Sequence, residues 1–111
     1  MLSGLFAVEF IANNNQFGAG IVVISEGTIN GGDLSYLYQG HFEYYEQEIK
    51  ASIEVRHYSG QRNAVMGPLN NFTLILSGRF SEGSFSVTGG IPNMPNLRIT
   101  INGRKIAELY E

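Results

Sequence analysis

The segment Gly31-Gly32-Asp33-Leu34-Ser35-Tyr36-Leu37-Tyr38-Gln39-Gly40 decides how this chain folds back on itself. Strand-like patterns flank it, so it reads as a corner between two hairpins rather than as an active site. Glycine adopts positive φ without steric cost, and an aspartate side chain can bond the backbone just after it. We therefore predict positive φ at Gly31 and Gly32 and a turn cap at Asp33. Three side chains should pin the corner to the core: Leu34, Leu37 and Tyr38.

Short segments of alternating apolar and polar residues recur about every ten residues, which is typical of β-sandwiches and barrels. In the clearest of them, Ala51, Ile53, Val55 and His57 alternate with polar residues. Asn102-Gly103 is a dipeptide of tight hairpin turns, so we predict a turn there. The predicted strands are 6–12, 16–25, 28–30, 38–45, 49–58, 72–77 (extended or bulged by 78–80), 85–88, 97–101 and 104–109.

These strands follow one another closely, apart from expected loops at 59–71 and 91–96. We therefore predict an all-β fold, a small antiparallel up-and-down barrel of about eight strands with little or no helix. Closure removes the unpaired edges of a sheet. The interior of such a barrel is filled by side chains or admits one small apolar ligand. The residues predicted to line this interior are Phe6, Val8, Phe42, Ile53, Leu74, Phe85 and Ile99.

Composition bounds the class of protein. The chain has 111 residues, of which 43% are hydrophobic and 15% charged, so we expect one ordered domain over 1–111 with its own core. Cysteine is absent, which excludes disulfides, thiolate catalysis and cysteine-ligated zinc. No catalytic or phosphate-binding motif is present. We therefore expect no enzyme activity and no cofactor.

Charge limits the partners. Seven Lys and Arg stand against ten Asp and Glu, a net charge of −3, and no basic run is present. Direct binding of nucleic acid needs clustered cations and is disfavoured. A weakly acidic surface suits a basic protein partner, although it also serves solubility. We identify no secretion signal and no apolar stretch of membrane-spanning length, so we expect a cytoplasmic protein without membrane contact.

The two histidines, His41 and His57, would need a carboxylate such as Glu43 to form a metal site. His57 shares the apolar face of its strand, so we interpret both histidines as structural and predict no metal. The carboxylates near the predicted hairpin at 38–58 form either a solvated tip or an acidic docking patch. The tyrosines of this region suit either cross-strand packing or a protein interface, and both interpretations stay open: Tyr36, Tyr38, Tyr44, Tyr45 and Tyr58.

One predicted strand is apolar on both faces. It contains the run Ile21, Val22, Val23 and Ile24. A strand with two apolar faces is expected to be covered on both. In a small barrel the outer cover is often a second copy of the chain, so we predict a homodimer interface at these four residues.

Several segments together resemble the GrlR-like family, and the Gly-Gly-Asp…Tyr-Gln-Gly element is the most specific. The segments that carry the resemblance cover most of the chain: Gly4-Leu5-Phe6-Ala7-Val8-Glu9-Phe10, Gly18-Ala19-Gly20-Ile21-Val22-Val23-Ile24, Glu26-Gly27, Gly31-Gly32-Asp33, Tyr38-Gln39-Gly40, Val55-Arg56-His57-Tyr58, Phe72-Thr73-Leu74-Ile75-Leu76-Ser77-Gly78 and 97–109.

The resemblance implies a lipocalin-like β-barrel that forms homodimers. It also implies a non-enzymatic negative regulator of type III secretion that sequesters a transcriptional activator. An acidic hairpin motif is implicated there in binding the activator. The matching hairpin of this chain is a diluted version of that motif, and it predicts the partner-binding residues Glu43, Tyr44, Tyr45, Glu46, Gln47 and Glu48. The alternative hypothesis is a binder or sensor of a small apolar ligand.

Overall fold

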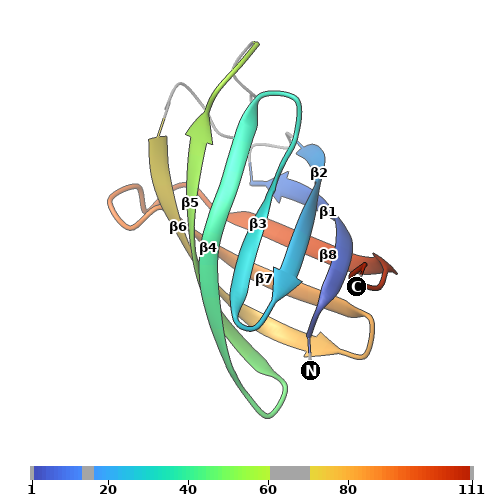
Figure 1. The fold of residues 1–111 in the computed structure, drawn as a ribbon. Helices are drawn as coiled ribbons and strands as arrows, with labels where there is room; N and C mark the ends of the chain where they lie inside the picture. Colours follow the sequence, from blue (N-terminus) through green and yellow to red (C-terminus); the bar gives the residue numbers. More distant parts are fainter. Residues whose placement is uncertain (1, 14–16, 61–70, 111) are drawn as a thin grey trace.

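The computed structural model describes residues 2–13, 17–60 and 71–110, and the side chain of Phe17 is left undescribed. Every regular element in these residues is a strand (Figure 1), which confirms the predicted all-β class. The eight strands are β1 (Gly4–Ala12), β2 (Phe17–Ser25), β3 (Thr28–Gly32), β4 (Tyr36–Tyr45), β5 (Glu48–His57), β6 (Asn71–Ser81), β7 (Ser84–Gly90) and β8 (Ile99–Ala107).

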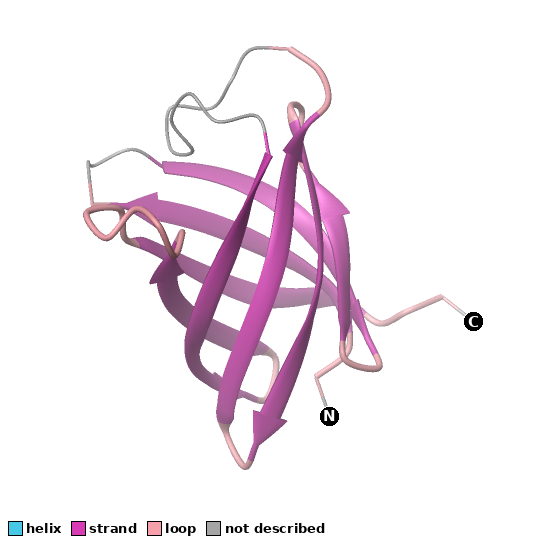
Figure 2. Ribbon diagram, turned by 90° about the vertical axis from the view of Figure 1, so that its left-hand side faces the viewer, coloured by secondary structure: helices cyan, strands magenta, loops and turns pink. Residues whose placement is uncertain are grey.

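The sheet closes on itself. Each strand pairs antiparallel with the next strand, and β8 pairs back with β1, where Phe10 lies opposite Ile101. The view turned by 90° shows one continuous wall of strands around the interior (Figure 2). The predicted eight-stranded up-and-down barrel is therefore confirmed.

The up-and-down topology sorts the connections between two ends. The β2–β3, β4–β5 and β6–β7 turns lie at one end, together with the start of β1 and the end of β8, where Leu5 pairs with Ala107. This is the lower end in Figure 1, and the opposite end is called the upper end. The long connections belong to the upper end.

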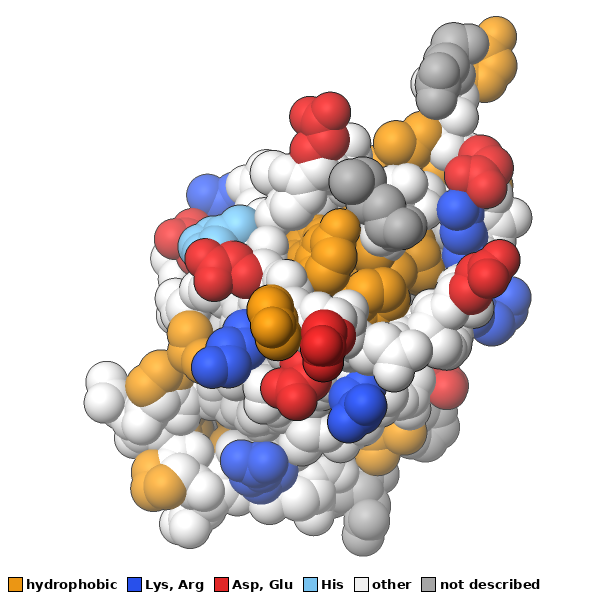
Figure 3. All heavy atoms as spheres, turned by 90° about the horizontal axis from the view of Figure 1, so that it is seen from below, with side chains coloured by type: hydrophobic (Ala, Val, Ile, Leu, Met, Phe, Trp, Pro, Cys, Tyr) orange, Lys and Arg blue, Asp and Glu red, His pale blue; other side chains and the backbone are white. Residues whose placement is uncertain are grey.

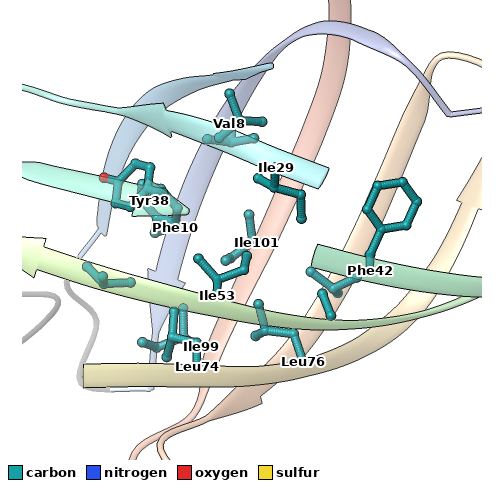
Figure 4. Packing of buried hydrophobic residues seen from close by; sticks show 14 of the residues in the cluster. Val8, Phe10, Ile29, Tyr38, Phe42, Ile53, Leu74, Leu76, Ile99 and Ile101 are labelled. Atoms are coloured by element: carbon teal, nitrogen blue, oxygen red, sulfur yellow. The ribbon is translucent and has the colours of Figure 1, made fainter. Parts of the chain in front are cut away.

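The interior is apolar because inward-facing residues alternate with polar outward ones. Phe6, Val8 and Phe10 of β1 are all at most 3% exposed. Side chains from opposite walls meet in the middle of the barrel (Figure 4). The rings of Phe10 and Tyr38, for example, lie edge to face with their centroids 5.2 Å apart. Among the described residues, no charged side chain is buried in this core.

Glycines occupy inward positions where neighbouring backbones come very close. A Cβ atom at Gly31 would lie 2.1 Å from the carbonyl oxygen of Ile21. At Gly40, Gly78 and Gly89 a Cβ would lie 2.0, 1.9 and 1.9 Å from a carbonyl oxygen of a neighbouring strand. Glycine kinks give a sheet the curvature that a closed barrel needs. These four positions therefore permit closure.

The prediction of positive φ at Gly31 and Gly32 is wrong. Both residues continue β3, and neither has positive φ. They are needed for close approach, since a Cβ at Gly32 would lie 2.7 Å from the carbonyl oxygen of Tyr36. The predicted cap at Asp33 is confirmed. Its Oδ1 accepts hydrogen bonds from the N–H groups of Ser35 and Tyr36, each at 2.8 Å.

Of the three side chains expected to anchor the corner to the core, only one is buried there. Tyr38 is 3% exposed, whereas Leu34 is 91% and Leu37 38% exposed. The prediction is therefore wrong for both leucines. Leu34 lies in the turn itself, and Leu37 falls on the outer face because it alternates with the buried Tyr36 and Tyr38.

The predicted turn at Asn102-Gly103 is also wrong, because β8 runs straight through it and joins two strands that were predicted separately. Gly103 pairs with Val8 on one side and Phe85 on the other. A Cβ at Gly103 would lie 2.3 Å from the Phe85 ring, so this glycine makes room for an aromatic side chain. Residues 61–70 of the predicted 59–71 loop lie outside the described part of the chain.

We predict that Gly31→Ala destabilises the barrel by about 2–3 kcal/mol, because the added methyl group must separate β2 from β3. Urea unfolding followed by circular dichroism measures the change. Gly83→Asn is the matched control, since Gly83 has φ 81° in an open turn that asparagine tolerates. An equal cost for the two variants would contradict the role assigned to Gly31.

Candidate partner-binding surface

A polar network around Asp33 holds the upper corner. The Tyr38 hydroxyl donates to Asp33 Oδ2, and the Tyr58 hydroxyl donates to the Asp33 carbonyl oxygen at 2.8 Å. Burial, together with the bond to Asp33 and its charge, raises the pKa of the Tyr38 phenol far above its ordinary value of 10.0. The phenol therefore stays protonated near neutral pH and is suited to structure rather than to proton transfer.

The two histidines do not converge. His41 lies on the exposed outer face of β4, whereas His57 faces inward at the upper end and contacts the Tyr36 ring edge to face at 5.3 Å. His57 Nε2 lies 2.9 Å from the Gly60 carbonyl oxygen. In the described residues no three His, Asp or Glu side chains are grouped as a metal site requires.

The β4–β5 hairpin distributes its predicted binding residues over two faces. Tyr45 lies opposite Glu48 and Glu43 opposite Lys50, and all four are exposed on the outer face. Tyr44 belongs to the inward face, opposite the buried Ile49. The remaining two residues, Glu46 and Gln47, form the exposed tip.

Cations partly balance the acidic residues of this hairpin. Lys50 is the cross-strand neighbour of Glu43, and Arg79 of β6 is the cross-strand neighbour of Glu48. Glu46 at the tip has no such neighbour across a strand, and its φ is 57°. The negative potential is therefore expected to be strongest at the tip.

The inward face of the hairpin is an ordered aromatic surface. Tyr44 is 41% exposed and stacks on Phe42 with a centroid separation of 5.9 Å. The Phe80 ring of β6 meets Tyr44 edge to face at 5.2 Å. The backbone N–H of Phe80 also donates to the Gln47 carbonyl oxygen at 2.9 Å, which ties β6 to the tip. A large aromatic surface is thus partly exposed beside the acidic tip.

The lower end of the barrel opens into a mouth of about 650 Å³. Seen from below, apolar side chains occupy the centre of this face and charged side chains surround them (Figure 3). The mouth is lined by Leu2, Ser3, Phe6, Phe80, Ser81, Glu82, Gly83, Lys105 and Glu108. It is an open hollow with an apolar floor and polar, partly charged walls.

Side chains fill the barrel interior almost completely. The cavity in the interior is about 40 Å³, compared with about 300–1,000 Å³ for ordinary ligand pockets. Of the residues predicted to line a ligand cavity, Phe6 and Ile99 are fully buried outside it. The others do line it: Val8, Phe42, Ile53, Leu74 and Phe85. Ligand binding stays a prediction, and it would require side chains to move.

The residues predicted for a dimer interface are divided between the two faces of β2. Val22 and Ile24 are buried inside the barrel, and only the outward Ile21 and Val23 could meet a second copy.

The tyrosines of the predicted hairpin region are also divided between the core and the surface. Tyr36 and Tyr38 pack in the core, whereas Tyr45 is 79% exposed at the tip.

The sequence patterns did not predict the mouth at the lower end of the barrel. Phe80 was expected only to extend or bulge its strand, but β6 continues regularly to Ser81 and turns Phe80 inward. The alternation that starts at Leu74 and Leu76 could have identified it. Leu2 and Glu82 had no strand pattern around them, so only the closed fold brings them together.

The fold defines a small β-barrel. Its exposed tyrosines and the acidic tip of the β4–β5 hairpin have the chemistry of a protein-contact surface. In the described residues no helix is long and apolar enough to cross a membrane. The family model described as "T3SS negative regulator, GrlR" matches residues 1–109. This chain belongs to that family of type III secretion regulators. No curated protein matches the chain.

We predict that Tyr38→Phe loses stability in a pH-dependent way. The unfolded chain releases the Tyr38 proton above pH 10, whereas the folded chain retains it, so the stability from this group is present below pH 10 and lost above it. The difference in unfolding free energy between wild type and variant should therefore narrow by about 1.4 kcal/mol per pH unit above 10. Urea unfolding between pH 8 and 11.5 measures it, and a constant difference would contradict the assignment.

Proposed function

We propose that this protein is a non-enzymatic negative regulator that binds and sequesters a transcriptional activator of type III secretion genes in the cytoplasm. The family match supports the regulatory role. The projecting β4–β5 hairpin, with its acidic tip and exposed tyrosines, is the observation that carries the proposed mode of binding.

The chemistry of the hairpin suits a basic protein partner. Tyr45 offers a large contact area with a hydroxyl that can form hydrogen bonds, as favoured at interfaces. Glu46 and Glu48 would attract cationic side chains and speed association. An activator held in this way would be withdrawn from its promoters without any chemical step.

We predict that Glu46→Lys combined with Glu48→Lys weakens binding of the activator about tenfold, because attraction becomes repulsion at the tip. Isothermal titration with the purified activator measures affinity, and a type III secretion reporter measures repression. Glu54→Lys is the matched control, since Glu54 is exposed on β5 away from the tip. Unchanged affinity and repression in the double variant would refute this mode of binding.

We also propose a homodimer that forms through the outer face of β1 and β2. Ile21 is 43% exposed there, and it pairs with Ala7, while Val23 pairs with Leu5. These four outward residues form a continuous apolar strip on a sheet whose other face is already buried. Covering the strip with a second copy would remove it from water.

Ile21→Lys is expected to convert the dimer into a folded monomer, because a charge would be buried in the apolar contact. Light scattering at micromolar concentration measures the mass. Ile75→Lys serves as the control, because Ile75 is 49% exposed on β6, outside the proposed interface. A wild-type protein that is already monomeric would contradict the proposed dimer.

A further inference from the structure

Glutamates mark all three hairpin turns of the lower end. The turns are Glu26-Gly27, Glu46-Gln47 and Glu82-Gly83, and the topology places all of them around the same opening. Glu26 and Glu46 have positive φ, 50° and 57°. Asparagine or glycine would adopt that conformation at lower cost. The acidic character of this end therefore extends beyond the β4–β5 hairpin.

Within the described part of the chain, none of these three carboxylates forms an ion pair. Lys105 is held by Glu108 at 2.8 Å, the single ion pair found in residues 2–13, 17–60 and 71–110. Arg79 lies opposite Glu48, and Arg104 lies opposite Ser84. The lining of the mouth carries two carboxylates, Glu82 and Glu108, and one cation, Lys105, so its net charge is weakly acidic.

The centre of the same end is apolar and aromatic. Phe6 and Leu2 form the floor of the mouth, and Leu2 also lines the small interior cavity, so it separates the two spaces. Phe80 lines the mouth and its ring meets that of Tyr44 edge to face, which connects the mouth to the aromatic face of the hairpin. The hollow, about 650 Å³ in volume and open to solvent, has room for one aromatic side chain against its apolar floor, while its walls are polar.

We propose that this lower mouth, rather than the hairpin alone, is the docking surface for the partner. Its occupant is a basic protein segment that carries one large apolar side chain. The apolar side chain enters the hollow against Phe80 and Tyr44, and flanking lysines or arginines face Glu46 and Glu82. This inference rests on the proposed function and deepens it by stating the chemistry of the bound segment.

The charge of the rim selects this occupant over an anionic amphiphile. A fatty acid head group would face Glu82 and would have to displace Glu108 from Lys105. Its chain would need space beyond Leu2, where the cavity is only about 40 Å³. A short basic segment requires neither change.

The probe is the peptide acetyl-Lys-Lys-Phe-Lys-Lys-amide, followed by ¹H–¹⁵N nuclear magnetic resonance of the full chain. We expect shift changes at Leu2, Phe6, Tyr44 and Phe80, and at least tenfold weaker binding when alanine replaces the peptide's phenylalanine. Shift changes confined to the outer face of the barrel, no binding, or stronger binding of decanoate than of the peptide would overturn the proposal.

Two sets of variants measure separately how charge and apolar contact contribute to binding of the peptide. Glu46→Gln with Glu82→Gln should weaken the peptide about fivefold at low salt, and Tyr44→Ala about threefold. The matched controls Glu54→Gln and Leu34→Ala alter exposed residues elsewhere and should change binding less than twofold. Equal effects in the variants and their controls would overturn the proposal. All of these side chains are exposed, so the variants should keep the fold.

A reporter of type III secretion gene expression distinguishes this inference from the proposed function. Loss of repression with both Tyr44→Ala and Glu82→Gln supports the mouth. Repression that responds to charge reversal at Glu46 and Glu48 but not to changes at Tyr44 or Glu82 overturns the mouth and leaves the function standing. Peptide binding at the mouth, without any effect of these variants on repression, supports the site and contradicts the function.

Discussion

Closure of the sheet through the β8–β1 pairing is the constraint on which the rest of this structure depends. Without it, both strands would present free edges, and their apolar inner faces would be open to water. Closure at this size requires strong local curvature. The inward glycines supply it, because any side chain there would meet a neighbouring carbonyl oxygen at about 2 Å.

The same closure creates the candidate surface. β4 and β5 have 10 residues each and β6 has 11, whereas β3 has only 5 and β7 has 7. The pairing of β3 with β4 ends at Thr28 and His41, so the β4–β5 hairpin projects past β3 at the lower end (Figure 1). Tyr44 faces inward by alternation and yet stays 41% exposed, because it lies beyond the part of β4 that pairs with β3. An aromatic surface beside an acidic tip follows directly from unequal strand lengths.

Much of the fold could be predicted because alternation is a local signal. Ala51, Ile53 and Val55 are buried as their spacing indicates. Local patterns predict a glycine's role wrongly where the glycine is required by a contact between distant strands. Gly103 looked like a turn residue but makes room for the Phe85 ring, a contact between β8 and β7 that no local pattern reveals.

The candidate site could be predicted only in part. The Glu46 tip was identified from sequence, but the cross-strand positions of Lys50 and Arg79, which reduce its acidity, depend on register. The mouth depends on closure, because Leu2, Glu82 and Lys105 come from separate parts of the chain. The spacing of these residues in the sequence does not indicate that they lie close together in the fold.

Hydrogen–deuterium exchange of the protein with and without the purified activator tests the central claim most directly. The account predicts that the activator protects the backbone amides of the lower end, at 42–50 and 79–85. The upper corner around Asp33 should exchange at an unchanged rate. Protection restricted to the upper corner, or to the outer face of β1 and β2, would contradict the account.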